Sequence, residues 1–424
     1  MTDQISAGSG EREHFIPIRK LDVLEAVAAD STFASEAERQ KFRQLCRLLA
    51  AILHHRFFDR LEKLRNDYFY FSPDVDHQRG VDEDTIERAY HELLDTLTGV
   101  LLSANFTEIP HDEINQAHRE HALVQVDVVA PRDNYREVRF FRRGQHRETI
   151  EISEWYGWRT RKVEVDVYND VVLLITIRKD ARPRKRHTRH VKLRPGSVLL
   201  KYFRDIARTD LNALFPDIRV VMGLKDRLWL GVPALLGVIP ILIKLATTIT
   251  VLFVVAAFYA GMGGSVKEAD TAGALAAVGG LAALGGFIMR QWTKFQRQSL
   301  LYQKILSENV YFRNINNNAG IFDYIIGDAE DQQCKKAFLT YHFLHQPADG
   351  PTEPELNRRI EEWLLSKFGV SVGFDCAEVL ERFEQLGILQ RDGERLFVGS
   401  PDEVLAKMQG LWTSFASDSA SAPA

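Results

Sequence analysis

Residues 244–263 read KLATTITVLFVVAAFYAGMG, and residues 272–290 read AGALAAVGGLAALGGFIMR. Each stretch supplies roughly the 20 mostly apolar residues that a helix needs to cross a bilayer. The turn between them, 264–271, is short and polar and includes Lys267. The pattern predicts a transmembrane hairpin with Lys244 at the headgroups, where its long stem can stay in hydrocarbon. The alternative is a helical hairpin buried in a soluble core.

The residues before the first span, 228–243, are also apolar, but Pro233 and Pro240 disfavour a straight helix there. We therefore expect a juxtamembrane segment, either interfacial or half-inserted. In the second span glycine and alanine recur at three- and four-residue spacing, which lets helices approach closely. This small-residue face would allow a homo-oligomer.

Basic residues flank both ends of the predicted hairpin, whereas its turn has only one. Because cytoplasmic flanks are rich in Lys and Arg, we expect both termini on the cytoplasmic side of a bacterial inner membrane. The lipid bilayer is then the first partner. The residues expected at its interface are Arg184, Lys185, Arg186, Lys244, Arg290, Trp292, Lys294 and Arg297.

Composition excludes several classes of protein. The 424 residues carry a formal net charge of -4, which gives no overall attraction to nucleic acid or acidic lipid. Cys46, Cys334 and Cys376 are too far apart for a disulfide framework or a zinc ribbon. The first residues contain neither a signal core nor a transit-peptide pattern. We expect a reducing compartment and no cofactor.

The N-terminal residues, 1–225, predict an α+β domain. Ser35 and Glu38 have the spacing of a capping box before a helical pattern, and a second helix is predicted over residues 83–103. Valines then alternate with polar residues, as in half-buried strands. Asn169 and Asp170 predict a tight turn within a hairpin.

The C-terminal residues predict helices and one β-ribbon. A helix is expected over residues 328–344, where Asp331 and Lys335 can pair on its surface. Helices at 353–368 and 375–386, a hairpin at 388–398 and a last helix at 401–415 suggest a winged-helix-like module. From residue 351 to 416 twelve acids oppose seven bases, so a protein partner is favoured over nucleic acid.

The full prediction is an α+β membrane protein. Its expected parts are an N-terminal domain (1–225), a juxtamembrane segment (228–243), two spans (244–263 and 272–290) around a turn (264–271), a helical segment (291–345), a winged-helix-like module (351–416) and a disordered tail (417–424).

Residues 178–194 hold nine Lys or Arg residues against one acid, Asp180. A plain solvated loop is the first interpretation. Contact with anionic lipid headgroups is the second, because basic residues near a membrane surface each contribute about 1 kcal/mol. Binding of nucleic acid or an acidic protein is less favoured, since the stretch lacks the aromatic platforms of single-strand readers.

No strong catalytic signature is present: the sequence lacks a phosphate-binding lysine loop, a nucleophile elbow and a two-histidine metalloprotease helix. No catalytic residue is therefore assigned. The best metal candidates are His111, His118 and His121, which lie among carboxylates. Their spacing fits no established ligand pattern, so a surface helix is the favoured interpretation.

Short motifs spread over most of the chain include Pro17, Arg143, Gly144, Phe215, Pro216, Glu330, Gln332 and Tyr341. Together these motifs resemble a family of uncharacterised membrane proteins, the domain of unknown function 3754, or transmembrane protein 143-like, family. The resemblance implies two spans and supplies no known activity. Its mild departure is an Asp at 331, where the family favours Glu.

The leading functional hypothesis is a membrane-anchored protein of unknown biochemical activity, an interaction or scaffold protein with both soluble domains on the cytoplasmic side and an unknown protein partner. The alternative is a membrane-associated enzyme acting on a lipid or another membrane-delivered substrate. An oligomeric channel or transporter subunit and a membrane-tethered nucleic-acid-binding regulator are less favoured.

Overall fold

A computed structural model describes residues 13–30, 33, 35–73, 77–114, 127–129, 132–154, 159–181, 194–216, 219–221, 312–345 and 350–421, with isolated positions between 253 and 297. The chain divides into two compact units. Unit 1 comprises Met1–Glu113, Arg132–Arg208 and Arg313–Ala424, and unit 2 comprises Ile114–Pro131 and Thr209–Phe312. In unit 2 the short strands β2 (Asp127–Val129) and β6 (Arg219–Val221) pair antiparallel.

Unit 1 contains a five-stranded antiparallel sheet in the order β1-β3-β4-β5-β7. Most of its pairing is between β3 and β4, which are 20 and 19 residues long. Short 3-10 helices precede β3 at Arg132–Asn134 and follow β5 at Arg208–Leu214. The strands are β1 (Thr107–Glu108), β3 (Tyr135–Glu154), β4 (Arg159–Ile177), β5 (Val198–Ala207) and β7 (Asn314–Asn317).

The turn predicted at Asn169 and Asp170 is wrong. Both residues lie inside β4, where Asp170 is opposite Arg143 of β3 and Arg204 of β5. Aspartate is normally depleted in strands, but here the two flanking arginines neutralise its carboxylate. A pair from distant strands thus overrides the local turn preference.

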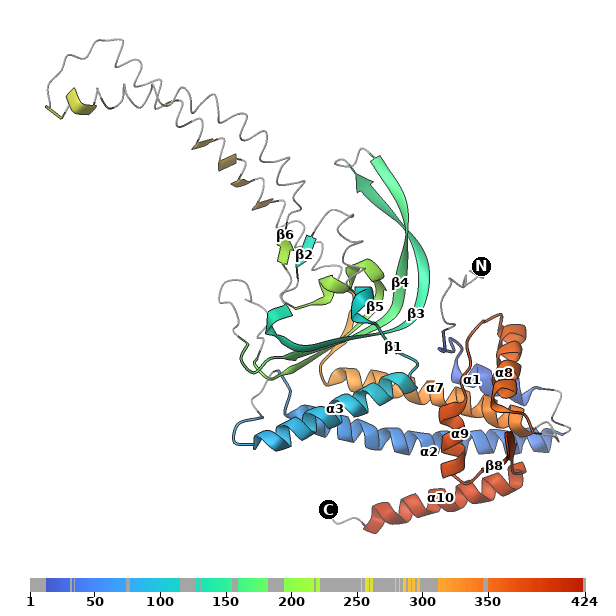
Figure 1. The fold of residues 1–424 in the computed structure, drawn as a ribbon. Coiled ribbons are helices and arrows are strands. Elements are labelled where there is room, and N and C mark those ends of the chain that lie inside the picture. The colour runs from blue at the N-terminus through green and yellow to red at the C-terminus, as the bar shows by residue number, and fades with distance from the viewer. Residues whose placement is uncertain are drawn as a thin grey trace. The chain divides into compact units, whose positions relative to one another are not determined.

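Three helices cover one face of this sheet: α2 (Glu36–Phe69), α3 (Glu83–Ser103) and α7 (Gly320–His345). Figure 1 shows them as a layer next to the strands. The core between the layers includes Phe141, Val172 and Tyr202 of the sheet and Phe322 of α7. The predicted N-terminus of α2 is confirmed, because the Ser35 hydroxyl accepts a hydrogen bond from the Glu38 amide at 3.2 Å.

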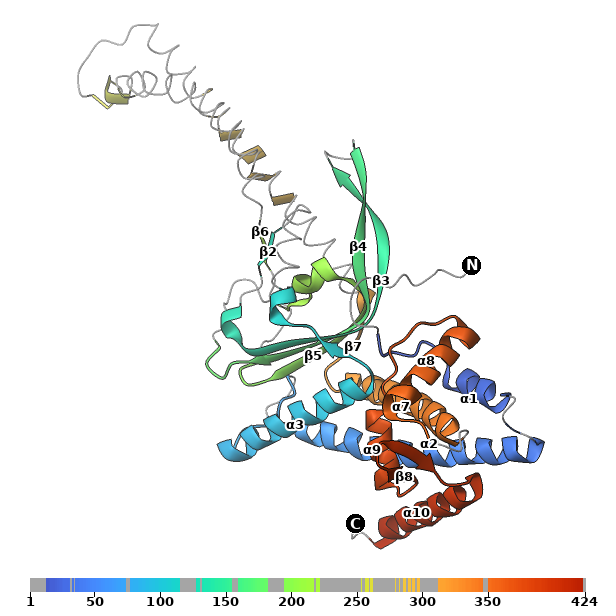
Figure 2. The ribbon, with the colours of Figure 1, turned by 45° about the vertical axis from the view of Figure 1, so that its right-hand side comes forward.

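A second core surrounds the other ends of α2 and α7 (Figure 2). It includes α1 (Lys20–Ala28), α8 (Glu353–Phe368), α9 (Ala377–Gln385) and α10 (Pro401–Ser421). The ribbon of β8 (Leu389–Asp392) and β9 (Arg395–Val398) contributes Leu389 and Leu396. The C-terminal elements therefore share one core with N-terminal helices. The helix predicted over residues 353–368 is confirmed, whereas α10 continues into the expected disordered tail.

The prediction of a membrane fold is contradicted. In the part of the chain that the structure describes, no helix is both long and apolar enough to cross a bilayer, for which about 20 residues would be needed. The described architecture is instead helices packed on an antiparallel sheet. The expected transmembrane hairpin and the multi-pass inner-membrane location are corrected accordingly. The stretches 244–263 and 272–290 lie outside the described residues except for isolated positions.

Gly144 of β3 occupies a backbone conformation that a side chain would strain. Its φ is +69°, and a Cβ there would lie 2.6 Å from Nδ2 of Asn169. We expect Gly144→Ala to lower the free energy of unfolding by about 1–3 kcal/mol, as measured by chemical denaturation. Gly80→Ala is the control, because Gly80 has a φ of +84° and open space around it. Equal losses at both positions would contradict a role for the Asn169 contact.

Candidate functional site

A buried charge network joins the sheet to α7. Arg143, which is 5% exposed, donates from Nη2 to Asp170 at 2.7 Å and to Asp328 of α7 at 2.8 Å. Asp170 also accepts hydrogen bonds from the Tyr202 hydroxyl at 2.8 Å and from Arg204 at 3.3 Å. We call these five residues the Arg143 network.

Aromatic rings enclose the cation at the centre of the network. The Arg143 guanidinium carbon lies 4.6 Å from the centre of the Phe15 ring and 4.5 Å from that of Phe106, distances typical of cation–π contacts. Burial acts to lower the Arg143 pKa, but Asp328 and Asp170 outweigh it, so the pKa is raised. Burial raises the pKa of Asp328, against the opposing effect of Arg143.

The N-terminal segment is held beside this network by α7. The Gln332 side chain accepts from the Ile16 amide at 3.0 Å and donates to its carbonyl at 3.2 Å. The Lys335 ammonium donates to the carbonyls of Ile16 and Ile18 and pairs with Asp331 at 2.7 Å. The predicted pairing of Lys335 with Asp331 is confirmed, but Lys335 is buried rather than on the surface.

These contacts indicate a structural role for the Arg143 network. The Nε, Nη1 and Nη2 atoms of Arg143 all donate within the chain, and the three protons of the Lys335 ammonium have three acceptors. Groups whose donors are already used cannot also hold a ligand without breaking internal bonds. The chain has a more open arrangement elsewhere.

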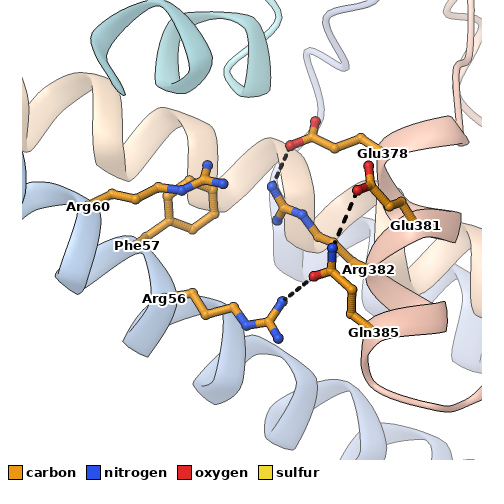
Figure 3. Close-up of a pocket in the computed structure, with 7 residues that line it drawn as sticks. All are labelled: Arg56, Phe57, Arg60, Glu378, Glu381, Arg382 and Gln385. Atoms are coloured by element: carbon orange, nitrogen blue, oxygen red, sulfur yellow. Dashed lines mark hydrogen bonds and ion pairs between the residues drawn. The ribbon is translucent and has the colours of Figure 1, made fainter. Parts of the chain in front are cut away.

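That arrangement is a cavity of about 150 Å³ between α2 and α9 (Figure 3). We call it the arginine cavity, because guanidinium groups from both helices face it. Arg56 donates to Oε1 of Gln385 at 3.3 Å, whereas Arg382 pairs with Glu378 of its own helix. The lining residues are Arg56, Phe57 and Arg60 of α2 and Glu378, Glu381, Arg382 and Gln385 of α9.

Like charges crowd the arginine cavity. Burial lowers the pKa of Arg56 and Arg60, and the positive charge of Arg382 lowers both further, while the Glu378 carboxylate partly opposes the lowering of the Arg60 pKa. The Phe57 ring lies between Arg60 and Arg382, 5.3 Å and 5.5 Å from their guanidinium carbons. Within the described part of the chain, neither Arg56 nor Arg60 forms an ion pair with a carboxylate. An anion entering the cavity would relieve this repulsion.

Sequence reasoning missed the arginine cavity. Arg56 and Arg60 are four residues apart on α2, and Glu378 and Arg382 are four apart on α9. Such spacing places each pair on one helix face, which could have pointed to two charged faces. It could not show that the two faces oppose each other, because the helices are more than 300 residues apart in the chain.

In a comparison with known families, residues 168–320 match a family described as protein of unknown function (DUF3754). We call these matched residues the DUF3754 segment. The match supports the predicted domain-of-unknown-function family over this segment, whereas the membrane-protein, transmembrane protein 143-like part of the prediction is not shown. No solved structure matches the chain. Asp170, Tyr202 and Arg204 of the Arg143 network lie inside the DUF3754 segment, whereas the arginine cavity lies outside it.

Two of the predicted motif residues, Phe215 and Pro216, fall within the DUF3754 segment. Phe215 is buried and Pro216 is partly exposed. The other motif residues lie outside the matched segment, so family roles at those positions stay a prediction. They are Pro17, Arg143, Gly144, Glu330, Gln332 and Tyr341.

The structure brings several of these motif residues near the Arg143 network. Pro17 lies in the segment held by Gln332, between the two residues whose carbonyls bind Lys335. Glu330 is placed differently, because its carboxylate contacts His54 at 2.8 Å. Tyr341 is buried in the second core and donates to the Gly399 carbonyl at 3.4 Å.

The predicted metal and lipid sites stay predictions, because most of their residues lie outside the described part of the chain. His111 is exposed, and no group of metal-ligating side chains occurs among the described residues. Arg290, Trp292 and Arg297 are exposed and helical. The remaining candidates lie outside the described residues: His118, His121, Arg184, Lys185, Arg186, Lys244 and Lys294.

Proposed function

We propose that this protein is an interaction protein that binds an anionic group of its ligand or partner in the arginine cavity. One observation carries the proposal: Arg56 and Arg60 face the cavity from α2 without a carboxylate partner among the described residues. Guanidinium groups recognise carboxylates and phosphates through paired hydrogen bonds. A partly buried site strengthens such bonds relative to open water.

Anion binding is tested by unfolding the protein at matched ionic strength in chloride and in acetate, phosphate or citrate. A ligand at ten times its Kd raises the free energy of unfolding by about 1.4 kcal/mol. We expect at least one of these anions to stabilise the wild-type protein. The double variant R56Q/R60Q should lose that stabilisation, because both unpaired guanidiniums are removed.

The matched control is Arg358→Gln. Arg358 lies on α8, outside the cavity, and its side chain is 69% exposed. This variant should respond to anions as the wild-type protein does. Equal stabilisation of the wild-type protein and R56Q/R60Q by every anion would refute binding in the cavity, because the effect would then come from elsewhere on the surface.

A further inference from the structure

We infer that the group bound in the arginine cavity is a single carboxylate, carried by a small carboxylic acid or by an acidic side chain of a protein. This inference rests on the proposed function and narrows it to one class of anion. The charge of the cavity and its available donors both support it.

The charge of the cavity matches a monoanion. Its lining has three guanidiniums and two carboxylates, so three positive minus two negative charges leave +1. Outside the lining, the buried Lys336 ammonium interacts electrostatically with Glu378 and with Asp375, so the charges of Lys336 and Asp375 offset each other. One carboxylate therefore neutralises the site. A dianionic phosphate would leave it negative beside Glu378 and Glu381, where like charges repel.

The donors that remain suit one carboxylate. Glu378 engages Arg382 and is itself held by the Ser103 hydroxyl at 2.8 Å and by Nε2 of Gln333 at 2.5 Å. Its position is thus set by α3 and α7 as well as by α9. Arg60 and the donors of Arg56 that do not bond to Gln385 are left for the ligand, and a planar guanidinium matches a carboxylate in two parallel hydrogen bonds.

The test is calorimetric titration of the full-length protein with four probes. They are acetate, inorganic phosphate, an end-blocked peptide Ala-Ala-Glu-Glu-Ala-Ala and its Gln-Gln counterpart. We expect acetate or the Glu peptide to bind more tightly than phosphate, and the Gln peptide not to bind. Arg56→Gln should weaken carboxylate binding about tenfold, the equivalent of about 1.4 kcal/mol.

The titrations distinguish a small carboxylic acid from an acidic protein side chain as the source of the carboxylate. They also distinguish failure of the carboxylate inference from failure of the proposed anion binding. Tighter binding of the Glu peptide than of acetate supports a protein partner, and equal binding supports a small acid. Phosphate binding that exceeds carboxylate binding and is lost in R56Q/R60Q overturns the carboxylate inference while keeping the proposed function. If no probe binds and no anion stabilises the protein, both fail.

Glu381→Gln tests the charge argument directly. Glu381 is exposed, and its carboxylate accepts a hydrogen bond from Gln385 at 3.4 Å, so its replacement leaves the core intact. The variant raises the lining charge from +1 to +2. We expect its phosphate affinity to rise severalfold relative to its acetate affinity. An unchanged ratio of the two affinities would contradict selection by charge.

Discussion

Arg143→Met should lower the free energy of unfolding by about 3–5 kcal/mol, the usual cost of removing one partner of a buried ion pair. The protein would lose stability because the carboxylates that Arg143 neutralises remain in the variant. Asp170 has a side chain only 12% exposed and receives two hydrogen bonds from Arg143, and Asp328 loses its 2.8 Å partner. Methionine fills a similar space but neutralises neither charge. Urea unfolding followed by circular dichroism measures the change.

Two variants show whether the loss comes from buried charge. Arg147→Met is the control on the same strand, because Arg147 is 61% exposed and pairs with Asp166 at 3.4 Å; it should cost less than about 1 kcal/mol. The double variant R143M/D170N should lose less than the sum of its single variants, since a neutral amide in place of the Asp170 carboxylate leaves no uncompensated charge at that position. A loss below about 1 kcal/mol in R143M would show that the network does not hold the sheet to α7.

The Arg143 network also shows why part of the fold could not be predicted from sequence. Helix ends depend on neighbouring residues, so the Ser35 cap and the helix over residues 353–368 were predicted correctly. Asp170 was placed in a turn on local preference alone. Its actual strand position depends on Arg143 and Arg204, which come from two other strands. Local patterns contain no information about such pairs.

The prediction that Lys335 lies on the helix surface was wrong for a similar reason. The four-residue spacing correctly paired Lys335 with Asp331, but the same pattern occurs on exposed helices and favoured a surface position. The deciding contacts come from the carbonyls of Ile16 and Ile18, more than 300 residues earlier. The arginine cavity was missed for the same reason, since its two helices meet only in the folded chain. Long-range packing, rather than residue type, decides both sites.

Acidification between about pH 6.5 and pH 4 should destabilise the protein through His342 of α7. This imidazole is 2% exposed and packs near Phe33 and Phe42. Burial lowers its pKa to about 4, against the opposing effect of Asp30, whose carboxylate lies 3.8 Å away; His345 lowers it slightly further. In the unfolded chain the histidine pKa is about 6.5.

The direction of this pH effect follows from the difference in the number of protons bound by the folded and the unfolded chain. Below about pH 6.5 the unfolded chain takes up a proton at His342 while the folded chain does not, so unfolding becomes more favourable as pH falls. The contribution of neutral His342 is intact above that pH and is progressively lost toward pH 4. At pH 5 the two pKa values correspond to a loss of about 2 kcal/mol.

His342→Gln isolates this contribution, because glutamine is polar and does not titrate. The quantity to compare is the change in the free energy of unfolding from pH 7 to pH 5, measured by urea denaturation of both proteins. The wild-type protein should lose about 2 kcal/mol more than His342→Gln over this interval, since the carboxylates that titrate there are common to both. Parallel stability curves for the two proteins would mean that the pKa of His342 is the same in the folded and unfolded chain, so that the Asp30 carboxylate offsets burial and the prediction is wrong.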